Sequence, residues 1–297
     1  MVAVSPPAKV LVTCANGYFA TWVFKTYLEA GYSVRGTVRS LSQGAFLIDK
    51  FAHYGDRFEL VVVEDITKDG AFDEAVKGVD AIAYTASPFH YKSTNPDDLI
   101  IPAVRGTTSI LNSALRHGST LKRLILTSSV ATVREDTAVP HAFTESNWND
   151  SAVERVKTKG SRAGPVTIYM ASKTLVEKVA WKFVAAHRSE ISWDLVVMNP
   201  PWIFGPSLNP APTVDDINTS QREIHDSLSG ARTSAQLRGQ GNWVHVAVAA
   251  EAHVRATSAV AASGQRIIVK SGPFFYQDLL DLAAELGIPN VPQGEPA

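Results

Sequence analysis

The sequence has very little cysteine, almost no net charge and no long apolar run. Of its 297 residues only Cys14 is a cysteine, and 28 Lys and Arg against 29 Asp and Glu leave a formal charge of −1. A single cysteine excludes an intramolecular disulfide framework and a cysteine-rich metal site. The balanced charge lacks the basic excess of a nucleic-acid-binding protein. No apolar run approaches the ~18 residues of a membrane-spanning helix, and the N-terminus lacks a secretory signal pattern. We therefore expect a soluble, cytoplasmic protein with no metal, nucleic-acid or membrane partner.

What the sequence does contain is a regular alternation of short apolar runs and longer segments with helical periodicity. This alternation is typical of βαβ units, in which helices cover both faces of a parallel sheet. The predicted fold class is α/β, a doubly wound parallel sheet of the Rossmann type. The expected strands are 9–13, 33–38, 58–63, 80–85, 122–127, 193–198 and 266–269, and the expected helices are 18–30, 97–117, 169–187 and 248–262.

Two polar segments interrupt this alternation, at 135–166 and 205–242. The first is expected to form a long loop with short structured pieces, and the second contains a possible helix at 214–229. Long inserts after strand ends are where doubly wound proteins contact ligands. We predict a dinucleotide-binding domain of residues 1–204 plus 243–270, and a small substrate-binding lobe of residues 205–242 plus 271–297.

A candidate dinucleotide-binding loop, Thr-Cys-Ala-Asn-Gly-Tyr-Phe-Ala, joins the first strand to the first helix at residues 13–20. The small residues Gly17 and Ala20 allow the backbone to approach a pyrophosphate, and the helix N-terminus offers free N–H donors. Cys14 stands where a first glycine would make the tight turn, and its side chain restricts the backbone there. On its own this loop is a weak indication of cofactor binding.

The ends of the second and third strands indicate which cofactor is bound. An acidic residue roughly 20 positions on is typical of NAD sites, whereas an arginine suits the 2′-phosphate of NADP. No acid lies between Glu29 and Asp49, and Arg39 ends the second strand. Arg35 is a second candidate, with a solvated surface arginine as the alternative reading. Asp65, after the third strand, is placed to accept a hydrogen bond from an adenine amino group.

A catalytic pair is suggested by Tyr169 and Lys173, four residues apart on a predicted helix. That spacing puts the phenol and the ammonium group on one helix face, and a nearby ammonium lowers a phenol pKa from about 10. The fifth strand ends in Thr127-Ser128-Ser129, which brings hydroxyl groups to the same sheet edge as the glycine loop. Three features therefore converge on one crevice.

These motifs together resemble an extended short-chain dehydrogenase/reductase. The resemblance is carried by the loop at 13–20, Thr-Ser-Ser at 127–129, Tyr-x-x-x-Lys at 169–173 and Asn-Pro-Pro-Trp-Ile-Phe-Gly-Pro at 199–206. Smaller motifs, including Trp-Val-His-Val at 243–246, are similar to the branch containing dihydroflavonol reductase, cinnamoyl-CoA reductase and the fungal aldehyde and ketone reductases. The sequence departs from that branch at Cys14 and after His245, where apolar residues stand in place of acids.

The resemblance implies a role for each matching residue. Tyr169 would protonate a carbonyl oxygen, Lys173 would hold the nicotinamide ribose and lower the Tyr169 pKa, and Ser129 would bond the carbonyl oxygen, with Ser128 as the alternative. The cofactor would be NADP(H). The implied cofactor-binding residues are Thr13, Asn16, Gly17, Tyr18, Phe19, Arg39, Asp65, Ile66, Thr85, Ala86, Ser87, Thr127, Tyr169, Lys173, Pro200 and Trp202.

The expected function is the NADPH-dependent reduction of aldehydes or ketones by a monomer or homodimer. The aromatic residues Trp202, Phe204 and Trp243 suggest a bulky or aromatic carbonyl substrate. One alternative is a nucleotide-sugar epimerase or dehydratase, although a dehydratase would carry an acid where Val130 follows Ser129. Another is a non-catalytic NADP-binding sensor, which the substitution at Cys14 favours and the retained catalytic residues disfavour.

Overall fold

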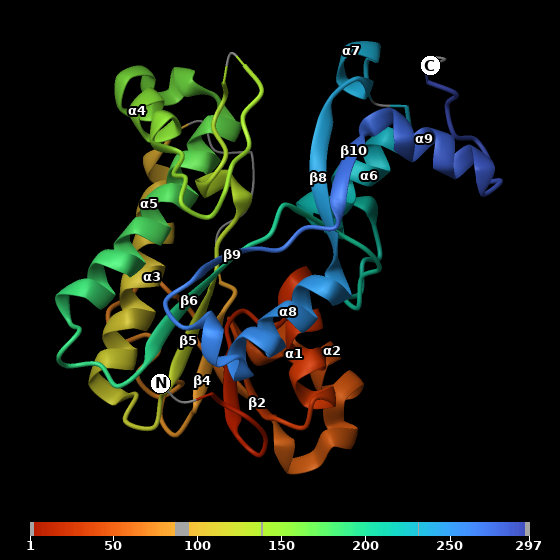
Figure 1. The fold of residues 1–297 in the computed structure, drawn as a ribbon. Helices are drawn as coiled ribbons and strands as arrows, with labels where there is room; N and C mark the ends of the chain where they lie inside the picture. Colours follow the sequence, from red (N-terminus) through yellow and green to blue (C-terminus); the bar gives the residue numbers. More distant parts are fainter. Residues whose placement is uncertain (1–2, 87–94, 138, 231, 295–297) are drawn as a thin grey trace.

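The centre of the molecule is a seven-stranded parallel sheet (Figure 1). The computed structural model describes residues 3–86, 95–137, 139–230 and 232–294. The strand order is β3-β2-β1-β4-β5-β6-β9, so the direction of winding reverses between β1 and β4. The strands are β1 Lys9–Val12, β2 Ser33–Val38, β3 Phe58–Val62, β4 Ala81–Tyr84, β5 Arg123–Thr127, β6 Asp194–Asn199 and β9 Arg266–Ile268. The predicted doubly wound fold is confirmed.

Helices cover both faces of this sheet. On one face α1, Tyr18–Glu29, packs against α8, Val246–Ser258, and α2, Leu41–Phe51, lies beside α1. On the other face α3, Asp97–His117, packs against α5, Pro165–Ala186, which also carries α4, Asp150–Lys159. The helix bearing Tyr169, α5, begins four residues earlier than expected, at Pro165. Proline suits the first turn of a helix because its missing N–H would have no partner there.

The central strands β1, β4, β5 and β6 have no solvent-facing side, which explains their continuous apolar runs. Along β1, Val10 and Val12 pack toward α1 and α8, whereas Leu11 packs toward α3 and α5. At Gly36 on β2, an added Cβ would lie 2.7 Å from Phe24 and 2.8 Å from Ala15. Only glycine allows β2 to lie this close to α1 and to the start of the predicted cofactor loop.

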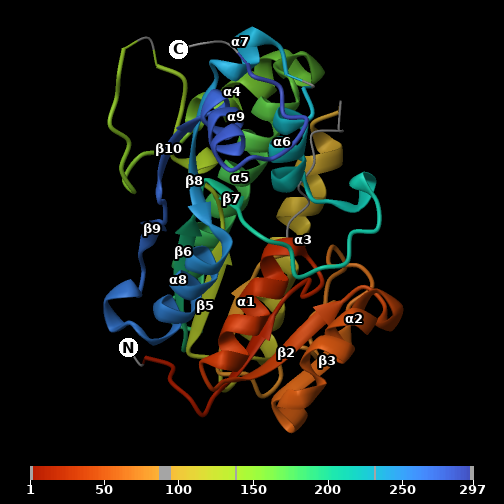
Figure 2. The same cartoon turned by 90° about the vertical axis from the view of Figure 1, so that its right-hand side faces the viewer.

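A smaller lobe stands beyond one end of the large sheet, above α1 and α8 in Figure 1 and at the top of Figure 2. Its three-stranded sheet has the order β10-β8-β7, with β7–β8 parallel and β8–β10 antiparallel. Its elements are β7 Trp202–Phe204, α6 Thr219–Leu228, α7 Ser234–Leu237, β8 Gln240–His245, β10 Gly272–Phe275 and α9 Tyr276–Glu285. The predicted boundaries at 204 and 243 lie within or next to this sheet, and the division into domains stays a prediction.

Several elements were not expected from the sequence. The segment 135–166 contains α4, and the possible helix at 214–229 is a 3-10 turn, Val214–Asp216, followed by α6. Within the part of the chain that the structure describes, no helix is both long and apolar enough to cross a membrane.

Candidate active site and cofactor cleft

A cleft of about 1280 Å³ opens at the carboxyl ends of β1, β2 and β3, next to the point where the winding reverses. In doubly wound folds this is where a ligand binds. The predicted cofactor residues that line it are Asn16, Gly17, Tyr18, Arg39, Asp65 and Ile66, and the sequence analysis missed Thr37, Ser42, Gln43, Phe46, Thr67 and Pro102. The fold thus brings together the three strand ends that the motifs indicated.

The floor of the cleft is the loop between β1 and α1, which contains Cys14. Cys14 has a φ of 50°, in the left-handed region that glycine adopts most easily. Its N–H donates to Thr37 Oγ1 at 2.9 Å, and its carbonyl oxygen accepts from the N–H of Gly17 at 2.8 Å. The tight turn of a first glycine is therefore formed with a side chain in place, and that side chain lines the cleft. Burial raises the pKa of the Cys14 thiol, and Arg39 opposes part of that rise.

Thr13, Thr85 and Ala86 lie behind this loop instead of lining the cleft. Thr13 is fully buried, and its Oγ1 accepts hydrogen bonds from the backbone N–H groups of Thr85 at 3.0 Å and Ala86 at 2.9 Å. The Thr85 hydroxyl in turn donates to the carbonyl oxygen of Thr13. These contacts join the ends of β1 and β4. Ser87, the next predicted residue, lies outside the described residues.

At the mouth of the cleft the side chain of Arg39 is exposed, and neither a hydrogen bond nor an ion pair joins it to another described residue. Arg35 differs, because its guanidinium group bonds Glu59 and the carbonyl oxygens of Ala75 and Lys77. The suggestion that Arg35 assists Arg39 was therefore wrong. Asp65 accepts two hydrogen bonds from Thr67, which hold its pKa below the ordinary value and keep the carboxylate ionised.

The opposite wall of the cleft is formed by residues 205–221, which we call the strap. Three hydrogen bonds fasten it to the cofactor loop and α1. Tyr18 Oη donates to the carbonyl oxygen of Gly205 at 2.9 Å, Trp22 Nε1 to that of Pro206 at 2.8 Å, and Asn209 Nδ2 to that of Asn16 at 2.6 Å. The strap residues lining the cleft are Ser207, Asn209, Pro210, Ala211, Asp216, Asn218 and Gln221.

The strap falls within the predicted substrate lobe, and its contact with the cofactor loop was not predicted. The sequence feature that could have indicated this contact is the run of turn-forming residues after the end of a strand. The strap begins at Gly205, whose φ of 142° would strain a residue with a side chain.

Of the three predicted catalytic residues, Ser129 lies at the end of β5 and Tyr169 and Lys173 lie on α5, and none of them lines the cleft. Ser129 caps the 3-10 turn Val130–Thr132, and its side chain is hydrogen-bonded to that of Tyr169. Lys173 follows one helical turn later on α5 and is only 7% exposed. Two hydroxyl groups and an ammonium group are therefore gathered at one sheet edge, as the motifs predicted.

Burial dominates the acid–base properties of this group. It raises the pKa of the Tyr169 phenol to about 12, and the hydrogen bond with Ser129 opposes part of the rise. It lowers the pKa of Lys173 to about 8, and the carboxylate of Glu177 acts in the opposite direction. The expected lowering of the Tyr169 pKa by Lys173 does not appear, because desolvation disfavours both charged forms.

The remaining predicted residues lie around this centre. The Thr127 hydroxyl is hydrogen-bonded to His253 Nε2 at 2.9 Å, and Phe19 packs edge-on against the same imidazole ring. The carbonyl oxygen of Pro200 accepts from the N–H of Val130 at 3.1 Å. Trp202 lies on β7 with its ring nearly parallel to that of Phe204, at a centroid distance of 6.1 Å.

No group of side chains suited to hold a metal ion is found among the residues described.

Comparisons with known proteins agree with this geometry. The family model described as the NAD dependent epimerase/dehydratase family matches residues 10–270. The chain is 35% identical over 273 residues to the ketoreductase azaE of Aspergillus niger, covering 90% of this chain and 78% of the relative. It is 34% identical over 266 residues to a cinnamoyl-CoA reductase of Medicago truncatula, covering 88% and 76% of the two chains.

Among solved structures, the yeast methylglyoxal/isovaleraldehyde reductase Gre2 complexed with NADPH superposes with a TM-score of 0.86 at 31% identity. The match covers 97% of this chain and 86% of that one. The resemblance to extended short-chain dehydrogenases/reductases is thereby confirmed, and the chain belongs to the NAD dependent epimerase/dehydratase family.

Proposed function

We propose that the protein is an NADPH-dependent reductase of aldehydes and ketones, with Tyr169 as the proton donor. The observation that carries this proposal is the hydrogen bond between Tyr169 and Ser129 at the end of β5, with Lys173 one turn further along α5. Two relatives support it by name, the ketoreductase azaE and the yeast methylglyoxal/isovaleraldehyde reductase complexed with NADPH.

The residues of the cleft fit a phosphorylated dinucleotide. Arg39 is exposed at the cleft mouth with no ion-pair partner among the described residues, so its charge is available to a 2′-phosphate. Gly17 precedes α1, whose free N–H groups and positive dipole end suit a pyrophosphate. No acid stands at the end of β2 to bond a ribose hydroxyl, which favours NADPH over NADH.

NADPH, when bound, supplies the hydride. The residues of the chain manage the charge that then develops on the carbonyl oxygen. Because its pKa is about 12, Tyr169 is protonated at neutral pH and holds the proton that the alkoxide needs. Ser129 is placed to donate a hydrogen bond to the same oxygen, and two donors aimed at one oxyanion lower the barrier. The phenolate left on Tyr169 regains its proton from solvent.

We propose a bulky or aromatic carbonyl substrate. The support comes from the small lobe, where Trp202 on β7 is paired in register with Trp243 on β8. Phe204 continues this aromatic group, since its ring packs against Phe274 at a centroid distance of 5.4 Å. Broad apolar ring faces suit an aromatic or branched substrate better than a small polar one.

The test is a panel of aldehydes and ketones, read by loss of reduced-nicotinamide absorbance with NADPH and with NADH. We expect turnover with NADPH, greatest for aromatic carbonyl compounds. Tyr169→Phe removes the proton and leaves the ring, so kcat should fall by roughly 100-fold or more. Full activity in Tyr169→Phe would contradict the catalytic assignment, and a lack of turnover by the wild type would contradict the proposed activity.

A further inference from the structure

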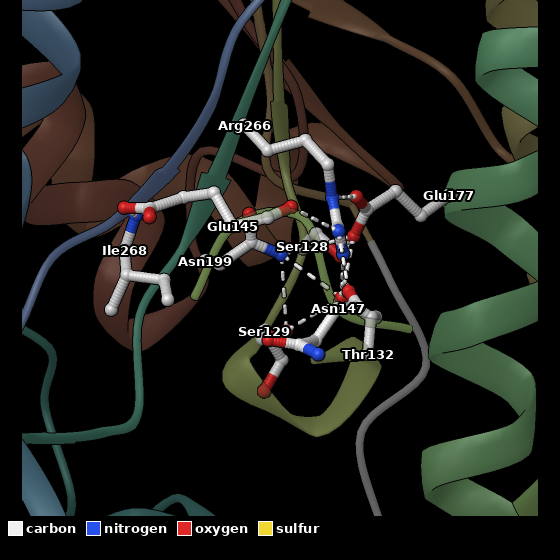
Figure 3. A network of polar contacts seen from close by, with 9 residues as sticks. All are labelled: Ser128, Ser129, Thr132, Glu145, Asn147, Glu177, Asn199, Arg266 and Ile268. Carbon is white, nitrogen blue, oxygen red and sulfur yellow. Dashed lines mark hydrogen bonds and ion pairs between the residues drawn. The ribbon is translucent and has the colours of Figure 1, made fainter. Parts of the chain in front are cut away.

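A buried carboxylate lies directly behind the catalytic residues. Glu177 is 0% exposed and is enclosed by donors from several elements (Figure 3). Its oxygens accept hydrogen bonds from Ser128 Oγ at 2.5 Å, Thr132 Oγ1 at 2.7 Å, Asn199 Nδ2 at 2.9 Å and Arg266 Nε at 2.5 Å. Four donors, one of them a guanidinium group, therefore satisfy the hydrogen-bonding capacity of this buried carboxylate.

Arg266 is held in place independently of Glu177. Its guanidinium donates to the carbonyl oxygens of Glu145 and Asn147, both at 2.6 Å, and stacks on the ring of Trp148 at 3.8 Å. Its side chain is 9% exposed. The charge that faces Glu177 is therefore fixed by β9 on one side and by the segment before α4 on the other.

The same donors define the position of Ser129. Asn199 Nδ2 donates to the carbonyl oxygen of Ser129 at 3.1 Å as well as to Glu177, and Thr132 Oγ1 lies 3.0 Å from the same carbonyl oxygen. Figure 3 shows Ser129 next to Thr132, below the ion pair of Arg266 and Glu177. The carboxylate thus anchors the turn that presents the Ser129 hydroxyl to Tyr169.

Glu177 also follows Lys173 by four residues, so the two lie on one face of α5 a single turn apart. It is the charged group that acts on Lys173. Arg266 from β9 faces the other side of the carboxylate, and Asp150 of α4 is already paired with Lys178. Glu177 is therefore the anion that acts on the buried ammonium of Lys173.

We propose that Glu177, paired with Arg266, is a positioning residue of the reductase site, which anchors the Ser129 turn and keeps Lys173 protonated. The proposal rests on the proposed function, because it assigns Lys173 and Ser129 their roles in that reaction. It extends the catalytic group from the cleft into the protein interior, through a residue that touches neither substrate nor cofactor.

The charge is tested with Glu177→Gln, which preserves the shape of the side chain. Without the anion the pKa of Lys173 should fall by about one pH unit, as is typical when an opposite charge within about 6 Å is lost. The alkaline limb of the kcat profile should move to lower pH by the same amount. Glu145→Gln is the matched control, because it removes a carboxylate from the outer part of the same network, where Glu145 Oε1 accepts from the N–H of Ile268. It should leave the limb in place.

A readout without cofactor or substrate is the titration of ¹³Cε-labelled lysine by NMR in the free protein. Lys173→Arg identifies the resonance. We expect a midpoint near pH 8 in the wild type, a lower midpoint in Glu177→Gln and an unchanged midpoint in Glu145→Gln. Arg266→Gln should raise the midpoint of the Lys173 titration, because Glu177 without its partner favours the charged ammonium more strongly. If Glu177→Gln does not fold, the Lys173 titration in Arg266→Gln tests the proposal.

A purely structural role for Glu177 would lower the unfolding temperature and leave both the midpoint and the limb unchanged, and this result would overturn the proposal. The two proposals fail in different ways. Full activity in Tyr169→Phe contradicts the proposed function whatever Glu177→Gln does. Loss of activity in Tyr169→Phe, together with an unmoved Lys173 titration in Glu177→Gln, contradicts only the role of Glu177.

Discussion

The side-chain amide of Asn209 donates a hydrogen bond to the carbonyl oxygen of Asn16 at 2.6 Å, across 193 positions of the sequence. The other amide atom, Asn209 Oδ1, is buried and meets no hydrogen-bond donor in the described part of the chain. A buried acceptor without a donor costs free energy. The Nδ2 hydrogen bond fastens one wall of the cleft to the loop that forms its floor.

Asn209→Ala is therefore expected to weaken NADPH binding. Loss of one neutral hydrogen bond, at about 0.5–1.5 kcal/mol, corresponds to roughly a 2- to 10-fold increase in the dissociation constant. The measurement is a fluorescence titration with NADPH. Asn112→Ala is the control, since Asn112 is half-buried on α3 and does not line the cleft. Equal constants for wild type and Asn209→Ala would show that the hydrogen bond between the strap and the loop does not shape the cofactor site.

Cys14→Gly should strengthen NADPH binding several-fold. The substitution removes a side chain from the cleft floor and suits the φ of 50° at this position. Stability should change by less than about 1 kcal/mol, because relief of left-handed strain is offset by the greater freedom of glycine in the unfolded chain. Cys14→Ser keeps the side-chain volume and should behave like the wild type. If Cys14→Gly and Cys14→Ser bind NADPH equally, the side chain of Cys14 does not limit access of the cofactor to the cleft.

Arg39→Gln should remove the preference for NADPH. A charge-assisted hydrogen bond contributes about 1.5–3 kcal/mol, so the dissociation constant for NADPH should rise roughly 10- to 100-fold while that for NADH stays the same. Isothermal titration with both cofactors measures the difference. Lys50→Gln removes the same charge from α2 outside the cleft and serves as the control. An equal loss of affinity for both cofactors would assign Arg39 to general electrostatics instead of the 2′-phosphate.

His253 should make the fold sensitive to acid. Its Nδ1 faces the carbonyl oxygen of Ala249 and must carry the hydrogen, so Nε2 accepts from Thr127, and burial lowers the pKa to about 4. Between pH 6.5 and 4 the unfolded chain binds the proton and the folded chain does not, so stability falls as the pH falls. The free energy of unfolding that His253 contributes should fall by about 2 kcal/mol between pH 7 and pH 5. Urea unfolding at both pH values should show a smaller loss for His253→Gln than for the wild type, and an equal loss would place the acid sensitivity elsewhere.

The large sheet and the order of the motifs along it could be predicted from local sequence patterns alone. All seven expected strands are present, and each bound lies within one residue of the prediction. The reason is that strands buried on both faces must be continuously apolar, so their signal is local and does not depend on distant residues. The Tyr169 and Lys173 pair was equally local, because four residues of helix place two side chains on one face whatever surrounds them.

The small lobe was much less visible in the sequence. β7 and β10 are short, and the three strands form a sheet only because residues 29 to 41 positions apart meet, as Trp202 meets Trp243. The helix α4 is largely polar, with Ala152 as its buried residue, so its periodicity was too faint to detect.

Which polar residues meet could not be predicted, because it depends on contacts between segments far apart in the chain. Nothing near Glu177 in the sequence identifies Arg266 as its partner, and nothing near Asn209 indicates Asn16. Such pairs are selected by how strands and loops converge at one edge of the sheet. The tertiary structure also decided the acid–base character of the site, since the i to i+4 spacing alone predicted a lowered phenol pKa. Burial raised the pKa of Tyr169 instead, because removal from water disfavours the charged phenolate.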